Sequence, residues 1–76
     1  MGLMQKWTEM TIGSSAYAFQ SKHGLPFRDA LERSLLQTRP GWTQGVLDTI
    51  SPALDRATTE KEMICIVAKY AFENKL

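Results

Sequence analysis

Cys65 and His23 are the residues whose types best suit chemistry, since they are the only thiol and the only imidazole in this sequence. A cysteine becomes a nucleophile when a nearby positive charge in a partly exposed site lowers its pKa, and a histidine is a common base beside it. Cys65 instead lies between Ile64 and Ile66 in an apolar run. We therefore expect Cys65 to be a buried structural cysteine.

His23 directly precedes Gly24, and this pair is typical of the end of a helix, where a histidine interacts well with the helix dipole. The eight carboxylates are scattered over polar positions. The sequence has no glycine-rich phosphate loop, no Ser/His/Asp order and no metal-ligand spacing. These observations predict a protein that is not an enzyme and holds no metal and no cofactor.

The composition is that of a small globular domain. The chain has 76 residues, of which 43% are hydrophobic, and a formal net charge of +1. Such a chain buries only about 60% of its unfolded surface, so a lone domain of this size is marginally stable. A single cysteine gives no internal disulfide. We expect one helical domain over residues 1–76 that gains stability from a partner chain.

Targeting signals are not apparent in the sequence. Met63–Ala68 is the longest apolar run, and it is far shorter than a membrane span. The first residues lack the apolar core of a signal peptide. A free cysteine without an export signal favours a reducing compartment. The expected setting is the cytoplasm, without membrane association.

Proline and glycine divide the chain into helical segments. Apolar residues recur at helical spacing in the four segments 3–22, 26–38, 43–57 and 60–75. Gly24 suits a helix end, and Pro26 suits a first helical position. Within the third segment, Ser51-Pro52 favours a break into two short helices, because a proline clashes with the carbonyl four residues earlier. One kinked helix is the alternative.

The segment 60–75 has the clearest start signal in the chain. Thr59 followed by Glu62 forms a capping box, and apolar residues then cover most of the helix circumference. A helix that is apolar nearly all round belongs in the centre of a fold. The expected fold is therefore an all-α, compact bundle of four to five short helices, with the C-terminal helix (about 60–75) central.

The function that suits this composition is protein binding. We expect a small non-catalytic regulatory or adaptor protein of the inhibitor, anti-activator or assembly-chaperone type, because methionine and tryptophan suit adaptable or anchoring contacts. The candidate partner-binding residues are Met4, Trp7, Met10 and Trp42. For the residues of the first segment, and for Trp42, burial in the core is the alternative that the sequence leaves open.

A homodimer would relieve the shortage of buried surface. The segment 60–75 has more apolar surface than three short helices readily cover, and the segment 3–22 also carries a wide apolar stripe. A two-fold pair that packs both segments against their copies would bury them. The candidate dimer-interface residues are Leu3, Tyr17, Phe19, Ile66 and Tyr70.

The alternative function is a small helix-turn-helix DNA-binding transcriptional regulator. The turn Thr38–Gly41 has about the right length between two helices. However, the second of these helices carries Asp48 and Asp55, which repel phosphate, and Lys and Arg residues are spread over all segments. A fold could still gather Arg28, Arg33 and Arg39. Nucleic acid is therefore not the expected partner.

Overall fold

The computed structural model of the chain describes the backbone of residues 2–76 and the side chains of residues 5–76. It contains four helices, α1 (Gly2–His23), α2 (Phe27–Thr38), α3 (Gln44–Arg56) and α4 (Glu60–Asn74), and the described residues form no strand. The prediction of an all-α bundle is confirmed, with four helices rather than five.

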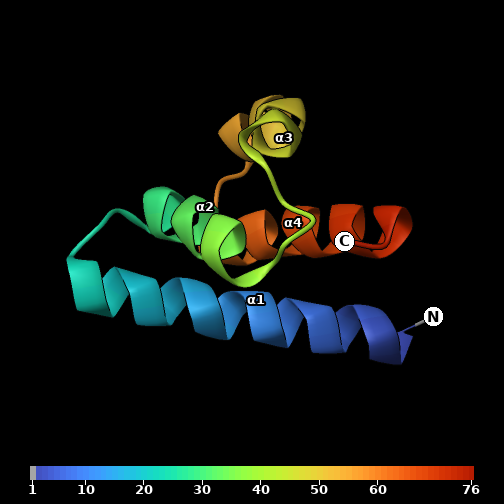
Figure 1. Cartoon of the computed structure of the whole chain (residues 1–76), viewed down its shortest axis with the longest axis horizontal. Coiled ribbons are helices and arrows are strands. Elements are labelled where there is room, and N and C mark those ends of the chain that lie inside the picture. The colour runs from blue at the N-terminus through green and yellow to red at the C-terminus, as the bar shows by residue number, and fades with distance from the viewer. Residues whose placement is uncertain (1) are drawn as a thin grey trace.

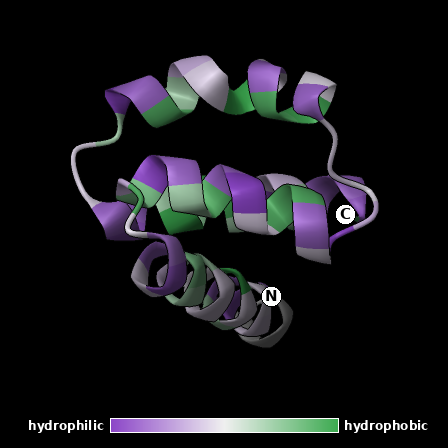
Figure 2. Cartoon of the chain, turned by 60° about the vertical axis from the view of Figure 1, so that its left-hand side comes forward, coloured by the Kyte–Doolittle hydropathy of each residue, from purple (hydrophilic) through white to green (hydrophobic). Residues whose placement is uncertain are grey.

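The helices form three layers, which Figure 1 shows from the side. The long helix α1 forms one outer layer, α2 and α4 form the middle layer, and α3 lies across the other side. The central position predicted for the C-terminal helix is confirmed, because α4 packs against each of the other three helices. In Figure 2 the hydrophobic side of α3 is turned toward the middle layer.

Local sequence signals set the ends of α1 and α4. Gly24 follows the last residue of α1 with a φ of 65°, and its N–H donates to the Gln20 carbonyl at 2.9 Å. This left-handed conformation favours glycine. At the start of α4, Thr59 Oγ1 accepts from the Glu62 N–H at 3.1 Å. Both boundaries agree with the sequence prediction.

The predicted break at Ser51-Pro52 is wrong, because α3 is one continuous helix that contains Pro52. Leu47, Ile50 and Leu54 are buried on both sides of the proline, and the side chain of Arg28 on α2 bonds to the same stretch of α3. Its Nη2 donates to Ser51 Oγ at 2.7 Å and its Nη1 donates to Asp55 Oδ1, so one guanidinium binds on both sides of the proline. Arg28 therefore adds polar contacts across the proline to the apolar burial of α3.

The core lies where the three layers meet. Trp42, in the α2–α3 connection, is only 3% exposed and packs on Tyr70 of α4 with ring centroids 5.9 Å apart. The other large or branched side chains buried here come from all four helices. They are Ile12, Phe27, Leu31, Leu35, Leu47, Ile50, Leu54 and Val67.

Candidate functional site

The thiol and the imidazole do not come together in the structure. Cys65 lies beside Glu9 of α1, whereas His23 ends the same helix fourteen positions later. At 1.5 Å per residue, Glu9 and His23 are about 21 Å apart along the helix axis. The two groups cannot act on one reacting atom, so the structure contains no cysteine–histidine pair.

Cys65 is half-buried on α4, which corrects the expectation that it is buried. Burial is the main cause that raises the pKa of the Cys65 thiol, and the nearby Glu9 carboxylate raises it further, while Lys61 acts in the opposite direction. A raised pKa keeps the sulfur protonated at neutral pH, and the protonated form is a poor nucleophile. These surroundings disfavour covalent catalysis by Cys65.

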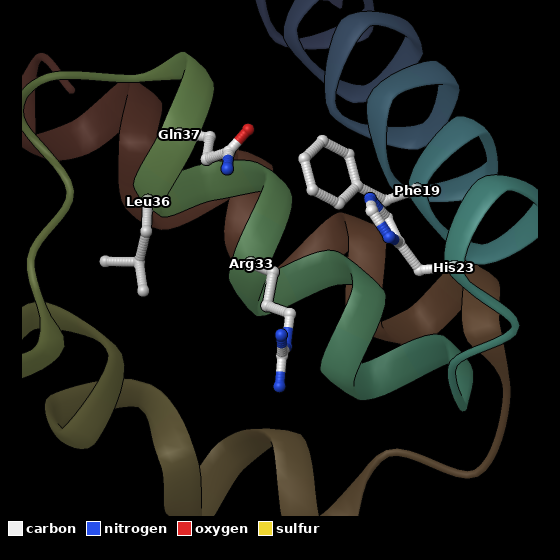
Figure 3. A pocket seen from close by; sticks show the side chains of 5 residues that line it. All are labelled: Phe19, His23, Arg33, Leu36 and Gln37. Carbon is white, nitrogen blue, oxygen red and sulfur yellow. The ribbon is translucent and has the colours of Figure 1, made fainter.

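His23 borders a shallow cavity of about 270 Å³ between α1 and α2 (Figure 3). Its ring packs on Phe19 with centroids 5.3 Å apart, so the two aromatic side chains form one wall. Arg33, from α2, extends away from this ring pair in Figure 3, as does Leu36. The polar groups of the cavity do not converge on a common point, which a specific ligand site would require.

The most distinctive surface is the outward side of α1. Trp7 is 65% exposed, Met10 57% and Tyr17 46%. Four smaller exposed residues fill the positions around them, and none of the seven carries a charge. We call this set the outer face of α1; it consists of Trp7, Met10, Thr11, Ser14, Tyr17, Ala18 and Ser21.

The sequence left open whether the large residues of the first segment lie in the core or on the surface. Trp7, Met10 and Tyr17 are not core residues of the single chain. The core is packed instead by Ile12 and Ala16 on the opposite side of α1, which are 1% and 0% exposed. A tryptophan and a methionine left in solvent on an uncharged surface are typical of an interaction site.

Other residues predicted for binding lie elsewhere. Trp42 is buried against Tyr70, so the expectation that it anchors a partner is corrected. Ile66 and Tyr70 are half-buried and line a groove between α3 and α4, where they pack against the core of their own chain. Their place in a dimer interface stays a prediction.

The remaining predictions fall on the first helix. Phe19 is half-buried, because it packs on His23 beside α2. The side chains of Leu3 and Met4 lie outside the described residues. Of the nine residues predicted for binding, the structure therefore leaves Trp7 and Met10 exposed side by side on α1. Tyr17 is also 46% exposed, but its ring packs on Phe27 with centroids 5.0 Å apart and its hydroxyl donates to Glu60 Oε1 at 2.9 Å.

The arginines that DNA binding would need are not gathered on a free surface. Arg28 is held by Asp55, Glu32 and Ser51, and Asp55 is the main cause that raises the pKa of its guanidinium. Arg39 Nη1 donates to the Leu76 carbonyl at 3.1 Å. The exposed side of α3 presents Asp48 and Asp55. These two carboxylates repel phosphate, and Arg56 at the end of α3 is the exposed cation beside them.

The sequence reasoning missed two exposed apolar residues. Leu36 on α2 and Phe72 on α4 are each 41% exposed. Phe72 lines a cavity of about 460 Å³ together with Thr8 and Arg39. The pattern of α4 gave no signal for this exposure, because nearly every side of that helix carries apolar residues.

The structure and the comparisons add three findings. Among residues 5–76, no three His, Cys, Asp or Glu side chains are grouped so that they could hold a metal ion. In the described part of the chain, no helix combines the length and the apolar character that crossing a membrane requires. Comparison with models of protein families, with curated proteins and with solved structures found no match.

Proposed function

We propose that this protein is a non-catalytic regulatory or adaptor protein that acts by binding another protein through the outer face of α1. The observation that carries the proposal is the 65% exposure of Trp7 beside Met10 at 57%. Truncating a buried interface tryptophan is among the most damaging changes in protein complexes. Leaving one in solvent exposes apolar surface that a partner would cover.

The form of α1 supports this role. The helix has 22 residues, so it is about 33 Å long, and α2 and α4 pack on one side of it (Figure 1). In Figure 2 much of α1 is pale, because many of its own residues have intermediate hydropathy. By contrast, α3 has one hydrophobic side and one hydrophilic side. A surface helix normally carries charge on its solvent side. The seven residues of the outer face carry none, and the charges beside them are those of Lys6, Lys22 and the Glu60 carboxylate that accepts from the Tyr17 hydroxyl.

The test compares proteins captured from a lysate of the source cells by three baits. The baits are the wild-type chain, the double variant Trp7→Ala/Met10→Ala, and the control variant Leu36→Ala. Leu36 is a matched control because it is also an exposed apolar residue, but on α2. All three baits should retain the same helical circular dichroism, since none of the three residues belongs to the core.

We expect the wild-type chain and Leu36→Ala to capture the same protein, and Trp7→Ala/Met10→Ala to lose it by at least tenfold. Loss of one buried anchor costs about 2 kcal/mol or more, which corresponds to a factor of about 30 in affinity. Equal capture by all three baits would show that the outer face does not bind the target, and would remove the proposal.

A further inference from the structure

The helix α3 stands apart from the other three helices. The packing of α1 on α2 and α4 is far more extensive than the packing of α3 on α4. In Figure 2, α3 lies over the middle layer and is joined to it at both ends by segments that are not helical, residues 39–43 and 57–59. A few residues outside a helix are enough to absorb the backbone rotation of a hinge. These two connections therefore allow α3 to move while the other helices stay packed.

The internal hydrogen bonding of α3 is weaker than that of its neighbours. Pro52 lies inside this helix and has no N–H to donate to the Asp48 carbonyl. The sequences of α1, α2 and α4 contain no proline. The helical form of α3 therefore depends on its contacts with the middle layer.

The contact between α3 and α4 is not completely filled. A cavity of about 270 Å³ opens there, and its walls include Thr49, Ile50 and Ala53 of α3 and Ile66 and Tyr70 of α4. Atoms that face a cavity have fewer contact partners than atoms in a close-packed core. Solvent therefore reaches one side of this contact while α3 is in place.

Buried apolar side chains hold α3 on the middle layer. Leu47, Ile50 and Leu54 of α3 are each at most 5% exposed, and Trp42, just before the helix, packs on Tyr70 of α4. Burial of such side chains is the main favourable contribution to folding. The seated position of α3 therefore predominates, and a detached α3 is a minor state.

Polar contacts add little to this attachment. Among the described residues, Arg28 supplies the hydrogen bonds that join α3 to another helix, and they go to Ser51 and Asp55. The Asp55 side chain is 62% exposed, so solvent screens its ion pair with Arg28. The attachment of α3 therefore depends on one apolar face.

From these features we propose that α3 is a lid that detaches as one unit, hinged at residues 39–43 and 57–59, while α1, α2 and α4 remain packed. A helix of 13 residues is marginal in isolation, and Pro52 weakens it further. The detached α3 therefore loses its helical hydrogen bonds. Opening uncovers the apolar side of the middle layer, which is a different surface from the outer face of α1, so this inference goes beyond the proposed function.

Native-state hydrogen exchange tests the lid, measured for each residue by NMR at several low concentrations of urea. We expect the slowest amides of α3 to exchange at least tenfold faster than the slowest amides of α1 and α4, and to share one opening constant. Their exchange should also depend less on urea, because opening exposes less surface than global unfolding does. Equal rates and equal urea dependence in all four helices would overturn the inference.

A matched pair of variants separates opening of the lid from global unfolding. Ile50→Val trims the buried face of α3, and Ile12→Val trims a similarly buried contact of α1. Both variants should speed exchange of the slowest α1 amides, roughly fivefold. Ile50→Val should speed the α3 amides by the same factor. Ile12→Val should leave the α3 amides unchanged, because α1 keeps its contacts when the lid opens.

Two results from these variants would contradict the lid. If Ile12→Val speeds the α3 amides as much as the α1 amides, α3 unfolds only together with the whole chain. If the α3 amides exchange faster but each with its own opening constant, the helix frays from its ends and does not detach as one unit. Neither result bears on the outer face of α1, which Trp7→Ala/Met10→Ala tests separately.

Discussion

Gly13 of α1 lies directly against Ile64 of α4, so that a Cβ at Gly13 would stand 3.3 Å from Ile64 Cδ1. A glycine in a helix interior costs about 1 kcal/mol relative to alanine. The structure shows that Gly13 is buried and that α1 runs through it without interruption. Its missing side chain is what allows α1 to approach α4 at this point.

Substitutions at Gly13 should therefore depend on side-chain size. Gly13→Ala gains helix propensity worth up to about 1 kcal/mol, and the end of the flexible, half-buried Ile64 can shift, so the free energy of unfolding should change by less than about 1 kcal/mol. Gly13→Val overfills the contact and should lower that free energy by about 1–3 kcal/mol. Urea titrations measure both changes.

Gly45 provides the matched control. It lies in the first turn of α3, where a Cβ would meet Thr43 Oγ1 at an ordinary 3.7 Å. Both Gly45→Ala and Gly45→Val should be tolerated within about 1 kcal/mol. Equal losses for Gly13→Val and Gly45→Val would contradict a packing role for Gly13.

Pro52 interrupts the hydrogen bonding of α3 without ending the helix. Pro52→Ala supplies an N–H and removes the clash with the Asp48 carbonyl, which stabilises the helix. The variant also gives the unfolded chain more conformational entropy, which offsets part of this gain. We therefore expect the free energy of unfolding to rise by about 1–2 kcal/mol. Thermal and urea unfolding measure the gain. Pro40→Ala, in the exposed α2–α3 connection, should give no gain, and a loss of stability in Pro52→Ala would argue against the continuous helix.

Arg28 joins α2 to α3 across the proline. Arg28→Met keeps much of the aliphatic stem but removes the bonds to Ser51 and Asp55. Because the Arg28 and Asp55 side chains are 29% and 62% exposed, the loss should be about 1 kcal/mol. The loss should shrink in 1 M salt, where the screening length falls to about 3 Å.

The control for Arg28 is Arg33→Met. Arg33 lies on the same helix and is exposed, so its replacement should change stability by less than about 0.5 kcal/mol. The double variant Arg28→Met/Pro52→Ala should recover much of the free energy of unfolding that Arg28→Met loses. A helix without the proline depends less on the bonds from Arg28 to Ser51 and Asp55. Full additivity of the two changes would show that the residues act independently.

Cys65 should react slowly with thiol reagents in the folded protein. Its raised pKa favours the protonated sulfur, and Glu9→Gln removes one cause, so this variant should react faster than the wild-type chain at pH 8. Glu73→Gln, on the exposed side of α4, is the control. Unchanged reactivity in Glu9→Gln would mean that burial alone protects the thiol.

The same pKa shift links Cys65 to stability. A folded pKa above the unfolded value means that the folded state holds the proton more tightly, so this contribution is complete below the unfolded pKa and disappears as the pH rises through the folded pKa. The stability of the wild-type chain relative to Cys65→Ala should therefore fall between pH 8 and pH 10. Urea titrations of both proteins across this range measure the difference.

The helix ends were predictable because their causes are local. Gly24 and Thr59 act within one turn of the helices that they end and begin, so the sequence contains the whole signal. The continuity of α3 was not predictable in this way. The contacts that favour it are not local: Arg28, which bonds to Ser51, is 23 residues away in the sequence, and only the folded chain brings the two together.

The roles of the two tryptophans were also beyond the sequence pattern. Both sides of α1 carry apolar residues, so its periodicity does not determine which side faces the core. Small residues determine which side of α1 faces the core. Gly13 and Ala16 let α1 approach its neighbours more closely than Trp7 would.

The contrast between Trp7 and Trp42 makes the protein its own fluorescent reporter. Trp42 is 3% exposed, and its Nε1 has no hydrogen-bond partner among the described residues, so its emission should lie at short wavelength. Trp7, at 65% exposure, should emit at long wavelength and be quenched by iodide. Trp7→Phe leaves a signal that follows unfolding of the core, and Trp42→Phe leaves one that follows what covers α1. The tryptophan emission of these two variants therefore distinguishes unfolding of the core from binding of a partner to α1.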